Sequence, residues 1–63
     1  MTQKELLYLE DAYMHECNII EICMETMNEL EDDDLVSFIE KEIKRHEKMK
    51  KELYSKMEGL ARE

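Results

Sequence analysis

Four consecutive acidic residues, at positions 31–34, divide this 63-residue chain into two segments whose apolar residues recur every three or four positions. That recurrence is the period of an amphipathic α-helix. The chain has no proline and a single glycine, so neither segment contains a residue that forces a helix to end early. The sequence therefore predicts two long helices joined by a short acidic turn.

The first predicted helix covers about residues 3–30 and begins with a capping box. In this motif the side chains of Thr2 and Glu5 satisfy backbone amides that the first helical turn leaves free. The apolar seam predicted for this helix consists of Leu6, Tyr13, Cys17, Ile20, Met24 and Met27. The turn follows at about residues 31–33, because aspartate is favoured at helix N-termini and starts a second helix there.

The second predicted helix covers about residues 34–60. Its predicted apolar stripe consists of Leu35, Ile39, Ile43, His46, Met49, Leu53, Met57 and Leu60. Because the connection is short, the helices must fold back on each other. We therefore expect a single all-α domain over residues 1–63, an antiparallel two-helix hairpin.

A hairpin this small buries little apolar surface. The first segment also carries a second stripe, formed by Tyr8, His15, Ile19 and Ile22, which lie within about 60° of one another around a helix. A helix that is apolar on two sides needs two partners. We expect a second copy of the chain to cover this stripe, giving a homodimeric four-helix bundle with twofold symmetry.

The formal net charge of −8 is distributed unevenly. Residues 1–34 contain one base and eleven acids, a charge of −10, whereas residues 35–63 contain eight bases and six acids, a charge of +2. An acidic protein binds nucleic acid poorly, because affinity comes mainly from neutralising phosphates. The apolar runs are also far shorter than the roughly 20 residues of a membrane-spanning helix. We therefore expect neither nucleic acid nor membrane as a partner.

Cys17 and Cys23 are six residues apart, so on one helix their side chains point about 120° apart and cannot form a disulfide. The chain has no C-x-x-C motif that would indicate a zinc or redox site. No apolar segment resembles a secretory signal. We interpret the cysteines as core thiols of an intracellular protein.

Two groups of polar residues fall on the predicted apolar faces. If the turn is centred near residues 32 and 33, Glu10 lies level with Lys56, and we expect an ion pair that sets the register of the helices. Glu10, Glu42 and His46 are weak candidates for metal ligands. His46 would face Ile20, where no carboxylate is available, so one hairpin does not complete a metal site and we expect no cofactor.

A family resemblance adds to this interpretation. Three groups of residues carry it: the early Glu5-Leu6-Leu7, Asp11-Ala12 and His15-Glu16, the acidic turn Glu31-Asp32-Asp33-Asp34-Leu35, and the later Ile43-Lys44-Arg45-His46-Glu47 with Met57 and Gly59. In these features the chain resembles the coat F family of spore coat proteins, which is ferritin-like in fold. The resemblance implies a non-enzymatic structural or assembly protein of the spore coat, with other coat proteins as possible partners.

Small phosphatases of the sporulation phosphorelay are similar in length and topology. Their Ser-x-x-x-Asp signature fails here, because Lys41 stands four residues after Ser37. We therefore expect no catalytic residues and no enzymatic activity. Two alternatives to a structural protein remain open: a small ferritin-like metal-binding protein with a site completed across a dimer, and a regulatory hairpin that docks on a larger protein.

Overall fold

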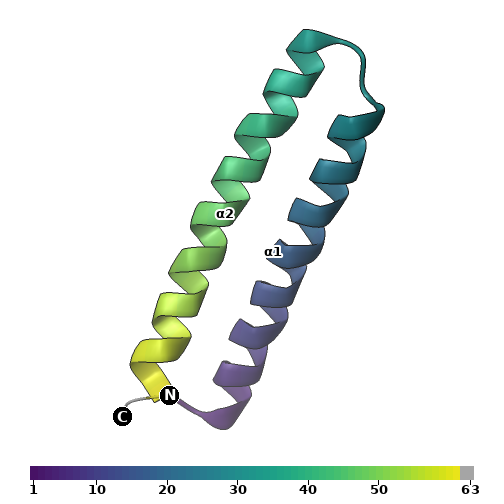
Figure 1. The fold of residues 1–63 in the computed structure, drawn as a ribbon. Helices are drawn as coiled ribbons and strands as arrows, with labels where there is room; N and C mark the ends of the chain where they lie inside the picture. Colours follow the sequence, from purple (N-terminus) through teal and green to yellow (C-terminus); the bar gives the residue numbers. More distant parts are fainter. Residues whose placement is uncertain (62–63) are drawn as a thin grey trace.

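The computed structural model describes residues 1–61, with side chains described through residue 59. Helices α1 (Gln3–Glu29) and α2 (Asp33–Ala61) run antiparallel and side by side along nearly their whole length (Figure 1). The Cα atoms span 47 × 15 × 11 Å, so the molecule is an elongated rod. The predicted all-α hairpin is confirmed.

Helix α1 starts at the capping box that the sequence predicted. The Thr2 hydroxyl accepts a hydrogen bond from the Glu5 amide at 3.1 Å, and the Glu5 carboxylate accepts one from the Thr2 amide at 3.0 Å. The backbone hydrogen bond from Thr2, together with one from its hydroxyl, favours the ionised carboxylate and lowers the pKa of Glu5. The first turn is therefore held by reciprocal bonds between residues that are close in sequence.

The four acidic residues lie partly in the turn and partly in the first turn of α2. The Leu35 amide donates to Oδ1 of Asp32 at 3.0 Å, and the Val36 amide donates to the Asp32 carbonyl, so Asp32 is the N-cap of α2. Asp33 and Asp34 lie in the first turn, where the helix dipole favours negative charge. At its other end α2 continues through Gly59 to Ala61.

One continuous seam joins the helices. Its residues alternate in steps of three and four, and all of them are buried or half-buried. On α1 they are Leu6, Leu9, Tyr13, Glu16, Ile20, Cys23 and Met27, and the C-cap residue Leu30 continues the series. On α2 they are Val36, Ile39, Ile43, His46, Lys50, Leu53 and Met57. The seam thus includes three polar residues near its middle.

This seam differs in part from the predicted one. Met24, Leu35 and Met49, predicted to lie on it, are exposed, and Cys17 is half-buried beside it. Leu60 lies outside the described side chains. The prediction differs because it left out Glu16 and Lys50, through which the actual alternation passes.

The register of the helices also differs from the prediction. The connecting residues are centred on residue 31, because α1 ends at Glu29 and α2 begins at Asp33. This centre is about two residues earlier than predicted, so each residue of α1 faces a position about four residues earlier on α2. His46 accordingly meets Glu16 rather than Ile20.

The hairpin has a very small core. Among the described side chains, the only buried apolar residues are Ile20 and Ile43, each 8% exposed. The chain exposes 5259 Å², whereas a compact monomer of 7.7 kDa exposes about 4,300 Å². A single hairpin therefore leaves roughly 900 Å² more surface in water than a compact protein of its size.

The capping role of Asp32 gives the first prediction. Replacing it in Asp32→Ala removes the acceptor for the Leu35 amide, and we expect the free energy of unfolding to fall by about 1 kcal/mol. Urea denaturation followed by circular dichroism measures the change. Glu31→Ala is the matched control, because it removes one charge from the same acidic run without touching the cap. Equal losses in the two variants would show that charge, not capping, accounts for the effect.

Candidate functional site

A buried acid and a histidine meet at the centre of the seam. Nδ1 of His46 on α2 lies 2.5 Å from Oε2 of Glu16 on α1. The side chains are only 14% and 10% exposed. With the carboxylate ionised, the ring nitrogen donates the hydrogen bond. This contact is a short, partly desolvated polar link between the helices.

Two further residues connect this link to the surface. Oε2 of Glu42 lies 3.7 Å from Nε2 of His46 and 2.7 Å from NH2 of Arg45. Side-chain exposure rises along this row, from 10% at Glu16 through 14% at His46 and 28% at Glu42 to 63% at Arg45. The result is a series of polar and charged side chains that runs from the middle of the seam to solvent, which we call the polar row: Glu16, His46, Glu42 and Arg45.

The geometry of the polar row is that of a structural link. The two carboxylates approach opposite nitrogens of the imidazole ring, so their oxygens and a ring nitrogen do not converge on one point where a metal ion could sit. Within the described residues, no group of three or more His, Cys, Asp and Glu side chains could hold a metal ion. The row gives the buried Glu16 carboxylate a partner in His46 and ties one helix to the other.

The predicted site residues are thus divided. The structure brings Glu42 together with His46, but Glu10 is exposed and lies elsewhere on α1. Glu10 and Lys56, predicted to form a register-setting ion pair, are both exposed and form no ion pair with any described residue. Because Glu16 faces His46, each residue of α1 faces a position about four residues earlier on α2 than predicted. Glu10 and Lys56 therefore lie at different levels along the rod. Glu16 and His46 make the polar contact across the seam instead.

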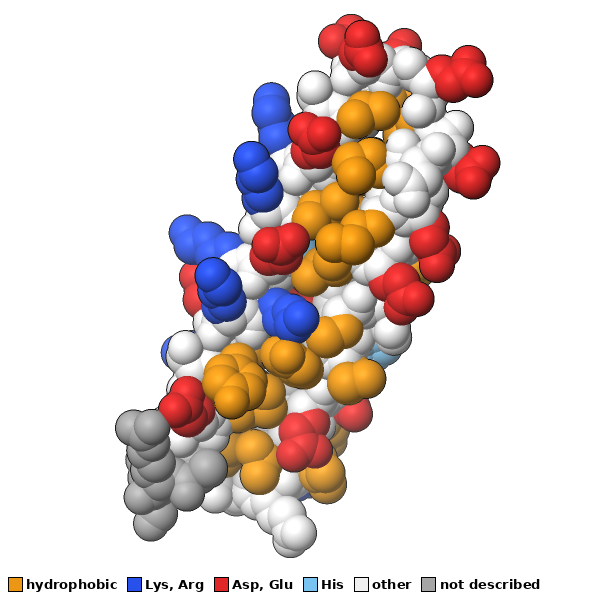
Figure 2. Space-filling view, viewed as in Figure 1, with side chains coloured by type: hydrophobic (Ala, Val, Ile, Leu, Met, Phe, Trp, Pro, Cys, Tyr) orange, Lys and Arg blue, Asp and Glu red, His pale blue; other side chains and the backbone are white. Residues whose placement is uncertain are grey.

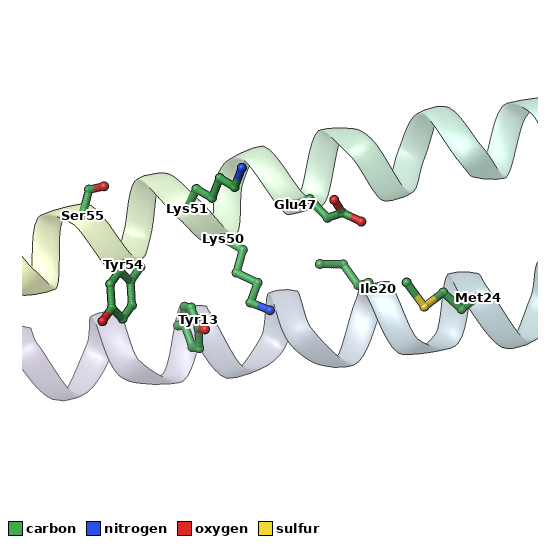
Figure 3. Close-up of a pocket in the computed structure, with 8 residues that line it drawn as sticks. All are labelled: Tyr13, Ile20, Met24, Glu47, Lys50, Lys51, Tyr54 and Ser55. Atoms are coloured by element: carbon green, nitrogen blue, oxygen red, sulfur yellow. The ribbon is translucent and has the colours of Figure 1, made fainter.

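One side of the seam is hollowed beside two tyrosines. The rings of Tyr13 and Tyr54 lie 6.2 Å apart, and Nζ of Lys50 lies 5.5 Å from the centre of the Tyr13 ring. Figure 3 shows Lys50 reaching from α2 toward α1, while Lys51 and Ser55 point away from it. The alkyl part of Lys50 therefore fills a seam position while its ammonium group stays at the edge, above an aromatic face.

The other side of the seam carries a wide apolar surface. Successive residues of a helix are rotated by about 100° about its axis. The stripe predicted on α1 therefore lies about 200–260° around the helix from Ile20. On α2, Leu35, Phe38 and Met49 lie about 220–280° around the helix from Ile43. Because the helices are antiparallel, residues at equal angles from Ile20 on α1 and from Ile43 on α2 lie on the same side of the hairpin. A hollow lined by Tyr8 together with Lys56 and Gly59 agrees with this placement.

We call this surface the lateral face: Tyr8, His15, Ile19 and Ile22 of α1 with Leu35, Phe38 and Met49 of α2. Three of its large side chains are strongly exposed, at 61% for Tyr8, 60% for Ile22 and 58% for Phe38, whereas Ile19 is half-buried. A monomer normally exposes apolar side chains singly, and a group of them on one side of a molecule is typical of an interaction surface. The sequence predicted only the α1 half of the lateral face, because the position of the α2 half depends on how each helix is rotated about the seam.

Charge is divided between the two edges of the rod. In Figure 2 acidic side chains line the edge formed by α1, basic side chains gather along the edge formed by α2, and apolar side chains run between them. This division follows from the sequence, in which all but one of the nine basic residues lie beyond position 34.

Comparison of the chain with protein-family models, curated proteins and solved structures finds no match. The resemblance to the coat F family therefore stays a prediction based on the residue pattern. Neither of the described helices is long and apolar enough to cross a membrane.

The link between Glu16 and His46 gives the second prediction. In Glu16→Leu the buried imidazole loses its main partner, and we expect the free energy of unfolding to fall by about 1–3 kcal/mol. The double variant Glu16→Leu/His46→Leu removes both polar groups and should recover most of that loss, because a well-packed apolar pair replaces a buried ionic pair at little cost. Urea denaturation of the four proteins of the cycle measures the coupling.

The control for this cycle is Glu42→Gln, at the more exposed end of the polar row, where we expect a change of less than about 1 kcal/mol. If the double variant is as unstable as the sum of the two single variants, Glu16 and His46 are not coupled and the polar row is not a link between the helices.

Proposed function

We propose that this chain is a non-enzymatic structural protein that acts through helix–helix association, with a second copy of itself as its first partner. The observation that carries the proposal is the lateral face, a group of exposed apolar side chains from both helices that Glu42 and Arg45 interrupt on α2. A four-helix bundle made of two hairpins would bury that face and enlarge the core.

The exposed area supports a partner of this size. The hairpin exposes roughly 900 Å² beyond the surface of a compact protein of its mass. A stable protein–protein interface buries about 800 Å² on each partner. One hairpin-sized surface is therefore enough to account for the excess.

We further propose that the assembly is a spore coat, in which other coat proteins would be additional partners. The support for this step is the residue pattern shared with the coat F family, from the His15-Glu16 pair to the acidic turn and the histidine at position 46. The groups of the polar row are directed at each other, which is consistent with a role that depends on helix packing and not on catalysis.

The third prediction tests self-association. In Ile22→Glu a carboxylate replaces an exposed apolar side chain of the lateral face, and burying it without a partner should weaken the dimer at least about a hundredfold. Sedimentation equilibrium should give a mass near twice 7.7 kDa for the natural chain and near 7.7 kDa for the variant.

Met24→Glu is the matched control, because Met24 is also an exposed apolar residue of α1 but lines hollows on the opposite side of the seam. This variant should stay dimeric. A natural chain that is a folded monomer would contradict the proposal and favour a regulatory hairpin that docks on a larger protein. A dimer that survives Ile22→Glu but not Met24→Glu would place the interface on the other side.

A further inference from the structure

Two hairpins can pair face to face with twofold symmetry in two ways, and they differ in which helices touch. If the twofold axis runs parallel to the helices, α1 of each chain packs against α2 of its partner, and both acidic turns lie at the same end. If the axis runs across the helices, α1 packs against α1 and α2 against α2, and the turns lie at opposite ends. The lateral face would be buried in both arrangements.

The charges of the two segments distinguish the arrangements. Helix α1 has one basic and seven acidic residues, a charge of −6, whereas α2 has seven of each, a charge of zero. A contact of α1 with α1 would therefore set two strongly acidic helices side by side over most of the 47 Å rod. A contact of α1 with α2 of the partner instead sets each acidic helix beside a helix with no net charge.

The residues that border the lateral face are acidic on α1 and of mixed charge on α2. On α1 the outer border, about 140–180° from Ile20, carries Asp11 and Glu25. On α2 the equivalent border carries Lys41 and Lys48 together with Asp34 and Glu52, and all of these side chains are exposed. When the twofold axis is parallel to the helices, the acidic border of one chain meets this border of mixed charge on the other. With the crosswise axis, Asp11 and Glu25 of one chain would meet the same acidic border of the other.

The apolar residues also match in level. Since Glu16 faces His46, Ile22 of α1 lies level with about residue 40 of α2. A parallel twofold axis keeps this relation between chains, so Ile22 would pack near the partner's copy of Phe38, and His15 near its copy of Met49. Two exposed apolar residues, Ile22 and Phe38, would thereby bury each other.

We propose that two chains pair through the lateral face with their twofold axis parallel to the helices, so that α1 of each packs on α2 of the other. This inference rests on the proposed self-association and adds its geometry. The arrangement brings two acidic turns to one end, but those residues are exposed, and at physiological salt charges are screened within about 8 Å. Repulsion between two ends in solvent costs less than repulsion along two whole helices.

Distances between spin labels test the arrangement. A single label is placed on the turn in Glu31→Cys, with Cys17→Ala and Cys23→Ala to remove the other thiols, and pulsed dipolar spectroscopy measures the distance between the copies. Packed helices lie about 8–10 Å apart, so labels at the same end should be within about 30 Å of each other. Labels at opposite ends would be separated by about the length of the rod, 47 Å.

A second label at the other end, in Gln3→Cys on the same background, is the matched control for stagger. Both labels should give short distances. A long distance at both positions would overturn the parallel axis while leaving the dimer intact. Absence of dipolar coupling, together with a mass of 7.7 kDa, would instead overturn the proposed self-association itself.

Discussion

Two helices that meet along a single seam can shield only one stripe of each from water, and this geometric limit governs the rest of the molecule. Ile20 and Ile43 are the only apolar side chains of the described part that fall below a tenth exposed. Hydrophobic stabilisation scales with apolar area removed from water. The lateral face is therefore the natural complement of the seam, because it offers apolar area that one hairpin has no means to cover.

The centre of the seam is polar where further apolar packing would give more stability. Glu16 and His46 satisfy each other there, and Glu42 with Arg45 extends the row to solvent. Buried ionic pairs add little net stability, but removing one partner is costly, so such a pair penalises any arrangement that separates it. A slip of the helices by one turn would move His46 about 5 Å from Glu16. We therefore interpret the polar row as the feature that fixes the register.

Local features of the structure could be predicted from the sequence, whereas relations between the helices could not. The capping box of Thr2 and Glu5 and the acidic start of α2 depend on residues a few positions apart, so their spacing was sufficient. The pairing of Glu16 with His46 depends on the centre of the turn, and an error of two residues there moved every facing position by four. The lateral stripe of α1 was predicted, but its continuation through Phe38 requires the rotation of both helices about the seam.

The central claim is that the fold of this chain is completed by a second copy, and the concentration dependence of thermal unfolding tests it most directly. Folding that is coupled to dimerisation is stabilised by mass action. Raising the concentration from about 5 µM to about 500 µM should therefore raise Tm by roughly 10 °C, followed by circular dichroism. A Tm that does not change over this range would mean that the single seam is sufficient and would contradict the account.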